Sequence, residues 1–285
     1  MSGPHREQFI KAMYKEIKTL ENLKTWNVIQ KSDVPTDQKV IPSTWAFKIK
    51  RYPDERLRKF KARFCVRGDR QEEVVDYFES YAPVVSWATV RMLMRIAIKE
   101  GWKSRQVDFQ NAFAQAPIRE EVYINMPPMF GESSKNTLMK LNKSLYGLVQ
   151  APLTWYDRLK KELERLGFEP SERDPCLFYR KDMIALVYVD DVVFFGKDIE
   201  KMDEVIQKCQ DDGYPLTKED DLFHFLGIDV KQDPETKKVT LTQLVLIENV
   251  LTYVGMSDCN TKAVPAQKMP LGTNANGESF DEEWD

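Results

Sequence analysis

Two runs of apolar residues flank a pair of acidic residues in the C-terminal half of the chain. Residues 184–189 and 192–195 are rich in β-branched and aromatic side chains, and Asp190 and Asp191 stand between them. The pattern predicts two buried strands joined by a tight hairpin. Adjacent carboxylates at the tip of such a hairpin repel each other and are disfavoured by burial, so the site favours a hard cation such as Mg²⁺. A turn chosen only for the backbone preferences of Asp is the alternative.

The rest of the pattern predicts helices and strands in irregular alternation. Apolar residues at helical spacing indicate helices over residues 9–23, 89–100, 153–166, 199–210 and 243–253, with a short one starting at 109. Segments of strand character cover residues 26–29, 40–50, 60–67, 102–107, 121–126, 138–141, 176–179 and 223–230. This order favours an α+β fold with a helix-backed, mostly antiparallel sheet.

Basic residues are concentrated near the N-terminus. Residues 48–70 hold ten Lys and Arg against three acidic residues, and Lys59, Lys61 and Arg63 alternate with apolar residues along a predicted strand. Residues 1–107 carry 22 Lys and Arg and 13 Asp and Glu, net +9, whereas residues 108–285 carry 20 and 32, net −12. A basic hairpin of this kind fits either a solvated face or a surface that binds phosphates.

Composition excludes several classes of protein. The chain has no run of about 18 apolar residues, so no transmembrane helix is predicted. The first residues have no apolar stretch of signal-peptide type. The four cysteines are far apart, which indicates reduced intracellular thiols. His5 and His224 are the only histidines, so a zinc knuckle is excluded and a Ser-His-Asp site is poorly supported.

A third carboxylate has a similar setting. Asp108 follows the predicted strand 102–107 and lies 82 residues before Asp190. If the two strands are neighbours in one sheet, Asp108, Asp190 and Asp191 meet at one edge. Two-metal phosphoryl transfer requires carboxylates around two ions roughly 3.5–4 Å apart. Taken alone, Asp108 also fits a cap at a strand end.

These residues carry a resemblance to a known family. Tyr188-Val-Asp190-Asp191 on a hairpin, with Asp108 upstream, resembles the catalytic signature of reverse transcriptases, and the closer resemblance is to the copia-type class of long-terminal-repeat retrotransposons. Further segments match in family order between about residues 9 and 272. They are Lys61-Ala-Arg63 with Gly68, and residues 76–85, 107–113, 121–128, 141–156, 174–177 and 225–228. Seven ordered motifs are more specific than any single one.

The resemblance implies a right-hand polymerase of α+β class, with fingers, a palm with a split β-α-β ferredoxin-like core, and a partial thumb. We expect the fingers in residues 1–105, with further finger elements in about 120–150. The palm is expected in residues 106–230 and the partial thumb in 231–262. Residues 263–285 are expected to be an acidic, flexible tail that leads toward a missing connection and RNase H.

By motif position, the resemblance implies a metal site. Asp108 and Asp190 would be the principal Mg²⁺ ligands and Asp191 would complete the cluster, with two ions bound and Mn²⁺ as a substitute. Phe113 matches the position that excludes a 2′-hydroxyl on the incoming nucleotide by steric clash. Ordinary core packing is the alternative for Phe113.

The resemblance also implies contacts to nucleotide and nucleic acid. Lys61, Arg63 and Gln150 would bind the dNTP together with Phe113, and Gly147 lies with Gln150 in the segment that supports the template–nucleotide pair. Residues 225–228 resemble the primer grip, although they also fit an ordinary core strand. The implied template and primer contacts are Tyr188, Gly147, Phe225, Leu226 and Gly227.

The implied activity is RNA-directed DNA polymerisation, in which a primer 3′-hydroxyl attacks the α-phosphate of a dNTP. The implied partners are an RNA or DNA template with its primer, dNTPs, and RNase H and integrase regions linked in a polyprotein, with no membrane. We expect an intracellular location, in a cytoplasmic virus-like particle for the parent element. A truncated or domesticated relic that binds nucleic acid without polymerising is the alternative. Ala114 and Asp220 depart from the family pattern, at positions peripheral to the carboxylates.

Overall fold

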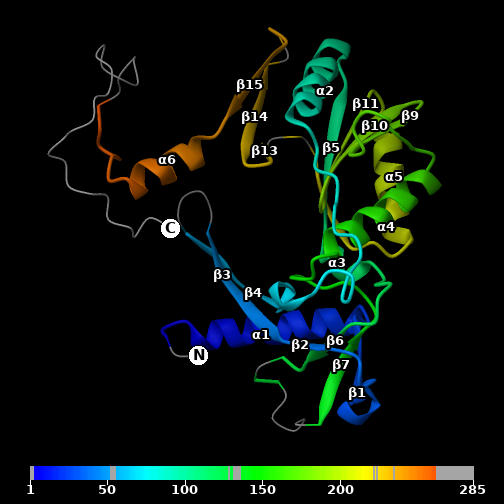
Figure 1. Cartoon of the computed structure of the whole chain (residues 1–285). Coiled ribbons are helices and arrows are strands. Elements are labelled where there is room, and N and C mark those ends of the chain that lie inside the picture. Colours follow the sequence, from blue (N-terminus) through cyan, green and yellow to red (C-terminus); the bar gives the residue numbers. More distant parts are fainter. Residues whose placement is uncertain are drawn as a thin grey trace, which may run out of the picture. The chain divides into compact units, whose positions relative to one another are not determined.

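A six-stranded antiparallel sheet occupies the middle of the chain (Figure 1). The computed structural model describes residues 3–51, 56–127, 129–130, 136–220, 222, 224–233 and 235–260. The strand order is β12-β5-β11-β10-β9-β8. The strands are β5 (Lys103–Phe109), β8 (Glu169–Pro170), β9 (Leu177–Arg180), β10 (Met183–Tyr188), β11 (Asp191–Gly196) and β12 (Leu216–Glu219).

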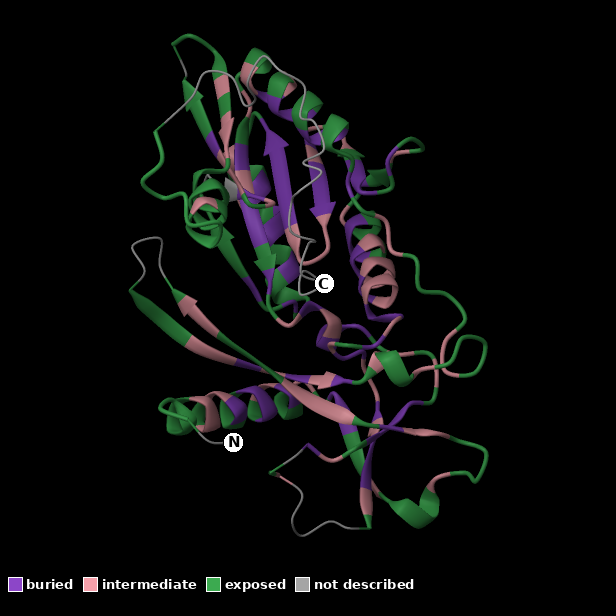
Figure 2. Ribbon diagram, turned by 60° about the vertical axis from the view of Figure 1, so that its left-hand side comes forward, coloured by how far each residue is buried: buried purple, intermediate pink, exposed green. Residues whose placement is uncertain are grey.

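Both faces of this sheet are covered, and residues 192–195 of its central strand β11 are apolar on both faces. In β11, Val192 and Phe194 pack with helices α3 (Ala112–Gln115), α4 (Ala151–Arg165) and α5 (Ile199–Asp211). Val193 and Phe195 point the other way and pack with α2 (Trp87–Glu100). Figure 2 shows the resulting buried strands in purple.

A three-stranded sheet extends the α2 side of this core. It consists of β13 (His224–Phe225), β14 (Ile228–Asp233) and β15 (Lys238–Thr242), in the order β13-β14-β15. Phe225 and Val230 are buried in the same cluster as Leu93 of α2. The three-stranded sheet is therefore attached to the face that lies opposite α4 and α5.

A second core lies between α1 and a four-stranded sheet. Helix α1 (Arg6–Asn22) contributes Ile17 and Leu20, and the sheet has the order β1-β7-β6-β2. Its strands are β1 (Trp26–Gln30), β2 (Val40–Ile41), β6 (Tyr123–Asn125) and β7 (Thr137–Leu141), with β2 and β6 parallel. The basic hairpin, β3 (Ser43–Arg51) and β4 (Leu57–Val66), packs its Phe64 into this core.

Local signals explain where several helices begin and end. The Ser86 hydroxyl accepts a hydrogen bond from the Ala88 amide at the start of α2, and Gly101 ends the helix with φ of 65°. Asp198 caps α5 by accepting from the amides of Glu200 and Lys201. Short 3₁₀ turns cover Lys31–Asp33 and Gly68–Arg70.

The chain divides into one unit that ends at Thr242 and a second that begins at Gln243. The described part of the second unit contains α6 (Leu244–Tyr253). Among the described residues, no helix is both long and apolar enough to span a bilayer. The predicted tail, residues 263–285, lies outside the described residues. The assignment of fingers, palm and thumb stays a prediction.

Several predictions from the pattern are corrected. The strand predicted over residues 40–50 is two strands, β2 and β3, and the short helix predicted to start at 109 starts at Ala112, because Phe109 still belongs to β5. The strand predicted over residues 223–230 is two strands, because Leu226 and Gly227 both have positive φ, 55° and 75°, and form a turn between β13 and β14. Asp108 does not follow its strand but lies within β5, because the pairing with β11 and β12 continues as far as Phe109.

Candidate active site

The turn between β10 and β11 is held from two sides. Tyr188 and Asp191 are cross-strand partners, so Val189 and Asp190 form the turn. Val189 has φ of 51°, which is rare for a β-branched residue. The Trp155 indole donates a 2.6 Å hydrogen bond to the Val189 carbonyl oxygen, and the Phe109 amide donates to the Asp190 carbonyl oxygen at 2.8 Å. These two bonds tie the turn to α4 and to β5.

Three carboxylates meet beside this turn. Asp108 is the cross-strand partner of Asp191, and Thr217 of β12 pairs with Asp108 on its other side. Asp108 and Asp190 line one cavity, and Asp191 lines a neighbouring one. The strands of Asp108 and Asp191 are neighbours, as predicted, but the three carboxylates are divided between two cavities.

Burial and repulsion between carboxylates disfavour the ionised forms of Asp190 and Asp191, although the charges of Arg63 and Lys61 lower the pKa of Asp190. Burial raises the pKa of Asp190, and the Asp108 charge raises it further. Burial raises the pKa of Asp191 to about 6, with added repulsion from Asp190 and Asp108, while a hydrogen bond with the Gln106 side chain opposes the shift. A nearby cation would favour the ionised forms.

Carboxylate oxygens are the donors that Mg²⁺ and Mn²⁺ accept. The donor chemistry of Asp108, Asp190 and Asp191 therefore fits a hard divalent cation. Within the described ranges, however, no group of three or more His, Cys, Asp or Glu side chains is arranged to hold a metal ion. Asp108 and Asp190, which share a cavity, are the pair best placed to act as ligands.

Cations face Asp108 and Asp190 across a cavity of about 570 Å³. Lys50, Lys61 and Arg63 line it from the basic hairpin. Burial lowers the pKa of Lys61, and the charges of Arg63 and Lys50 lower it further. The structure thus brings the two predicted phosphate-binding residues, Lys61 and Arg63, to the same cavity as two of the predicted metal ligands.

An aromatic pair lies next to these cations. The Arg63 guanidinium carbon is 4.8 Å from the centre of the Tyr146 ring, and Tyr146 lies edge-on to Phe113 with ring centres 5.1 Å apart. Tyr146 lines the cavity, whereas Phe113 is half-buried behind it against two apolar cores. Tyr146 is a site residue that lies within the matched segment 141–156 but had no predicted role; its place beside Gly147 was the available signal.

Gly147 allows two backbone segments to touch. Its φ is 92°, and a Cβ atom there would overlap the Val66 carbonyl oxygen. A Cβ at Gly68 would in turn overlap the Gly147 carbonyl oxygen, and the Val66 amide donates to the Tyr146 carbonyl at 2.8 Å. Gly147 therefore fixes the segment that carries Tyr146 against β4.

Gln150 is not brought to the carboxylate cavity. Its side chain is buried and accepts a 3.0 Å hydrogen bond from the Gln71 amide, and its own amide donates to the Asp76 carbonyl. It lines a separate cavity of about 550 Å³ together with Phe78 and Thr154. Its predicted contact with a dNTP stays a prediction.

The remaining predicted residues gather on the other side of Asp191. Tyr188, Leu226 and Gly227 line a cavity of about 640 Å³ that also includes Asp191. Phe225 is buried, with its ring centre 6.4 Å from that of Tyr188. The cavity beside Asp191 thus contains three of the five residues predicted to bind template and primer, while Gly147 lies elsewhere.

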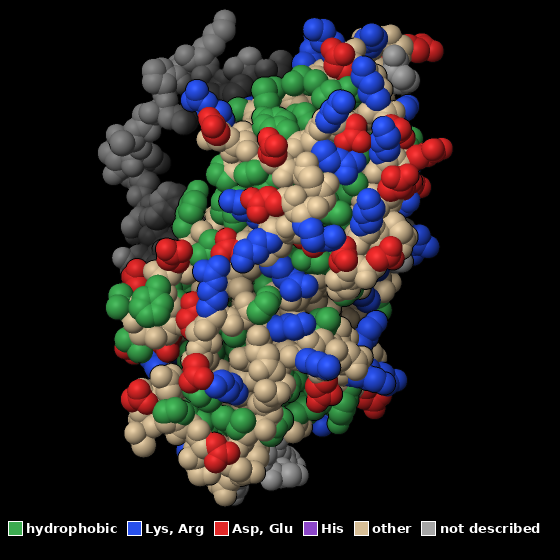
Figure 3. All heavy atoms as spheres, turned by 90° about the vertical axis from the view of Figure 1, so that its right-hand side faces the viewer, with side chains coloured by type: hydrophobic (Ala, Val, Ile, Leu, Met, Phe, Trp, Pro, Cys, Tyr) green, Lys and Arg blue, Asp and Glu red, His purple; other side chains and the backbone are tan. Residues whose placement is uncertain are grey.

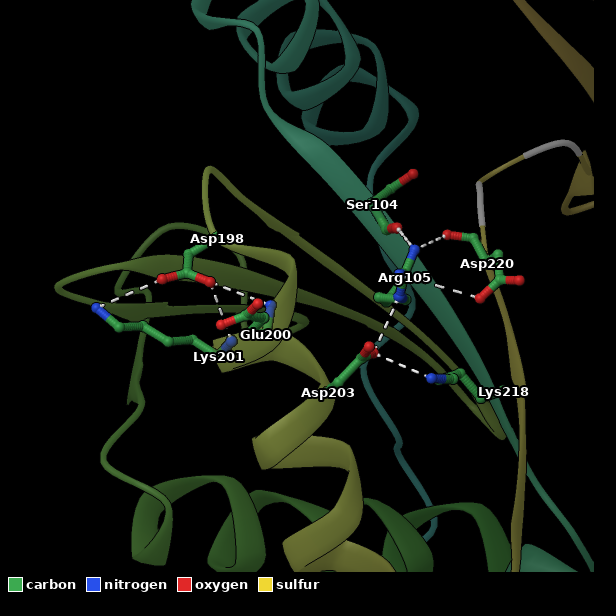
Figure 4. A network of polar contacts seen from close by, with 8 residues as sticks. All are labelled: Ser104, Arg105, Asp198, Glu200, Lys201, Asp203, Lys218 and Asp220. Atoms are coloured by element: carbon green, nitrogen blue, oxygen red, sulfur yellow. Dashed lines mark hydrogen bonds and ion pairs between the residues drawn. The ribbon is translucent and has the colours of Figure 1, made fainter.

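A polar network holds the segment that leads to this second cavity (Figure 4). The Arg105 guanidinium donates to Asp203 Oδ1 at 3.0 Å and to the Asp220 carbonyl oxygen, and Lys218 approaches Asp203 at 3.2 Å. The Ser104 hydroxyl accepts from the Leu222 amide at 3.1 Å. Asp220, which departs from the family pattern, is thus anchored to β5 through its backbone.

Positive charge is not confined to the basic hairpin. Lys and Arg side chains gather across the middle of the face shown in Figure 3, the side on which α4 lies in Figure 1. A cavity of about 400 Å³ is lined by Arg119, Arg158, Lys161 and Arg165 together with Asp157 and Glu162, and Arg119 pairs with Asp157 and Arg165 with Glu162. The basic residues around α4 are therefore partly neutralised by acidic partners.

Known proteins resemble this chain along most of its length. The family described as "Reverse transcriptase (RNA-dependent DNA polymerase)" matches residues 23–268. The "Retrovirus-related Pol polyprotein from transposon TNT 1-94" of Nicotiana tabacum is 30% identical over 277 residues, covering 93% of this chain and 20% of that protein.

Relatives from two other organisms match in the same way. The Pol polyprotein from transposon RE1 of Arabidopsis thaliana is 30% identical, over 93% of this chain and 18% of that protein. The Transposon Ty1-BR Gag-Pol polyprotein of Saccharomyces cerevisiae is 29% identical, over 94% of this chain and 15% of that protein. The chain spans a fifth or less of the length of these relatives.

Proposed function

The chain belongs to the reverse transcriptase family of copia-type retrotransposon Pol proteins, and we propose that it extends a primer 3′-hydroxyl with dNTPs on an RNA template. The observation that carries this proposal is the cavity in which Asp108 and Asp190 face Lys61 and Arg63. A nucleoside triphosphate with a divalent cation has the complementary charges: the cation for the carboxylates and the phosphates for the basic residues.

In this proposal Asp108 and Asp190 hold Mg²⁺ or Mn²⁺, with Asp191 adding negative charge beside them. When bound, two divalent ions would activate the 3′-hydroxyl and stabilise the negative charge that develops on the leaving pyrophosphate. The raised pKa values of Asp190 and Asp191 support this role, since both groups gain from a cation. The Trp155 and Phe109 hydrogen bonds keep the Asp190 turn in place before substrate binds. Little free energy is therefore needed to position Asp190 during the reaction.

Lys61 and Arg63 bind the triphosphate in the proposed complex, and together they orient the α-phosphate toward the primer end. Phe113 excludes a 2′-hydroxyl in concert with Tyr146, whose ring it contacts. The cavity beside Asp191 receives the primer terminus, in contact with Tyr188, Leu226 and Gly227. Gln150 supports the template–nucleotide pair from its neighbouring position.

The organisation proposed for the chain is that of a right-hand polymerase. The basic hairpin with α1 and the four-stranded sheet would be the fingers, and the six-stranded sheet would be the palm. Because its relatives are Pol and Gag-Pol polyproteins, we also propose that the chain acts while linked to RNase H and integrase regions. A cytoplasmic virus-like particle is the proposed location for the parent element.

Primer extension by the purified chain tests this function. Wild type is compared with Asp190→Asn and with Asp37→Asn, which neutralises an exposed aspartate that lines none of the cavities described above. Wild type and Asp37→Asn should extend a DNA primer on RNA with dNTPs and Mg²⁺, and Asp190→Asn should not. A folded wild-type chain that binds primer–template but never extends it would favour the non-polymerising alternative.

A further inference from the structure

Helix α1 presents one acidic side chain to its buried face. Met13, Ile17 and Leu20 form the apolar part of that face, and Glu16 stands among them with 9% of its surface exposed. One carboxylate oxygen of Glu16, Oε1, is fully buried and has no hydrogen-bond partner. An ionised group in this position is costly unless nearby charges compensate for it.

The compensating charges are on the basic hairpin. Helix α1 packs against β4, where Lys61 and Arg63 are two positions apart and so share one face of the strand. Burial raises the pKa of Glu16, while the charge of Lys61, a hydrogen bond from the Phe64 backbone and the charge of Arg63 lower it. Arg63 also has a buried nitrogen, Nε, without a hydrogen-bond partner.

The relation between these residues is reciprocal. Burial and, after it, the charges of Arg63, Lys50 and Lys59 lower the pKa of Lys61, and the charge of Glu16 opposes them. Glu16 therefore helps Lys61 to remain protonated next to other cations. It does so inside the active-site cavity, because Glu16 lines the same cavity as Lys61, Arg63, Asp108 and Asp190.

We propose that Glu16 is the resident counter-ion of Lys61 and Arg63 in the nucleotide-free protein, and that it competes with the phosphates of an incoming nucleotide. This inference rests on the function proposed above and adds a residue of α1 to the nucleotide site. Two half-buried cations without a counter-ion are unfavourable, and Glu16 relieves this before substrate arrives. When a triphosphate enters, its negative charge takes the place of the Glu16 charge as the partner of Lys61 and Arg63. Glu16 then repels the triphosphate.

Because of this competition, the site binds phosphates with moderate affinity. Binding of the nucleotide gives up the favourable interaction of Glu16 with the two cations, which reduces the net free energy gained on binding. Glu16 therefore raises the dissociation constant for the nucleotide. The same effect applies to pyrophosphate, which must leave after each addition. Glu16 is thus a positioning residue that adjusts affinity without touching the reacting atoms.

Binding of dTTP in the presence of Mg²⁺, without primer or template, tests the proposal. Glu16→Gln keeps the shape of the side chain and removes its charge, so it should bind dTTP about three- to tenfold more tightly by calorimetry. The rise in Tm on adding dTTP should also exceed that of wild type. Glu21→Gln makes the same charge change at an exposed position of α1 and should leave both values unchanged.

Two further variants separate this role from simple packing. Glu16→Asp retains the charge and should bind dTTP like wild type, whereas Glu16→Met lacks it and should bind more tightly. Equal or weaker binding by a folded Glu16→Gln or Glu16→Met, or an equal Tm rise in all variants, would overturn the proposal. If Lys61→Gln also binds dTTP like wild type, the phosphate site assumed in the proposed function is wrong. If Lys61→Gln binds dTTP more weakly but the Glu16 variants bind it like wild type, only the counter-ion role of Glu16 is wrong.

Discussion

Trp155 of α4 donates a 2.6 Å hydrogen bond from its indole nitrogen to the carbonyl oxygen of Val189, the residue before Asp190. The two residues are 34 positions apart in the chain. Val189 is held with φ of 51°, a conformation that costs free energy for a β-branched residue. The bond therefore helps to maintain an unfavourable turn that aims Asp190 into the cavity.

Trp155→Phe should slow extension while leaving dNTP affinity nearly unchanged. The substitution keeps an aromatic ring in the core but leaves the Val189 carbonyl oxygen without its donor, which costs about 1–3 kcal/mol. Chemical denaturation measures the loss of stability, and single-turnover incorporation measures the rate. Trp102→Phe is the matched control on another part of the core; equal effects from both variants would show that only packing is involved.

The contribution of Asp191 to the stability of the metal-free protein should fall as pH rises from about 4 to about 6. Burial raises the pKa of Asp191 to about 6, so the folded chain holds this proton more tightly than the unfolded chain does. The stabilisation is complete below the unfolded pKa, near 4, and is lost as pH passes the folded value. In EDTA at pH 7, Asp191→Asn should therefore be more stable than wild type by about 1 kcal/mol, allowing for solvent screening.

Asp182 provides a control of opposite sign. The Arg180 hydrogen bond holds the pKa of Asp182 below its usual range, so its contribution is present above the unfolded pKa and lost in acid. Asp182→Asn should then destabilise the protein at pH 7. Urea titrations between pH 4 and 7 distinguish the two cases, and an Asp191→Asn variant less stable than wild type at pH 7 would contradict the account of the carboxylate cluster.

Phe113→Ala should weaken discrimination against ribonucleotides by at least about tenfold, a change of roughly 1.4 kcal/mol between the two transition states. The ring of Phe113 contacts Tyr146, which lines the nucleotide cavity, so its removal opens space on that side. The ratio of kcat/KM for dNTP and rNTP is the measurement. Phe130→Ala, at an aromatic cluster around Trp45, should keep the wild-type ratio.

Gly147→Ala should lower the free energy of unfolding by more than about 2 kcal/mol, because it combines backbone strain with overlap of the Val66 carbonyl. Gly101→Ala isolates the strain, since Gly101 also has positive φ but has no atoms close to the new Cβ. It should cost only about 1 kcal/mol. Similar losses for the two variants in denaturant titrations would contradict the close approach of the two backbone segments.

Sequence patterns predicted the parts of the site that depend on local order. The hairpin around Asp190 was predicted because apolar runs flank a short polar break, and the pairing of Asp191 with Asp108 agrees with the prediction that their strands are neighbours. The basic face of β4 followed from the alternation that places Lys61 and Arg63 on one side. The resemblance to copia-type reverse transcriptases is confirmed by the family match.

Features that depend on tertiary contacts were missed. Leu226 gave no sign of a positive φ, so the turn before β14 was predicted as strand. The division of the carboxylates between two cavities depends on the register of the paired strands and on the residues that form the walls of each cavity. Glu16 looked like one of many charged residues on an amphipathic helix, and only the packing of α1 on β4 shows that it is buried.

Single-nucleotide addition to a primer annealed to RNA tests the central claim most directly. Wild type, Asp108→Asn, Asp190→Asn and the exposed control Asp37→Asn are each supplied with one dNTP and a Mg²⁺ series, after their folding and primer–template binding have been matched. We predict Mg²⁺-dependent addition by wild type and Asp37→Asn, and a loss of at least about a thousandfold in the other two variants, which corresponds to roughly 4 kcal/mol of transition-state stabilisation. Addition at the wild-type rate by Asp108→Asn or Asp190→Asn would contradict the assignment of the active site.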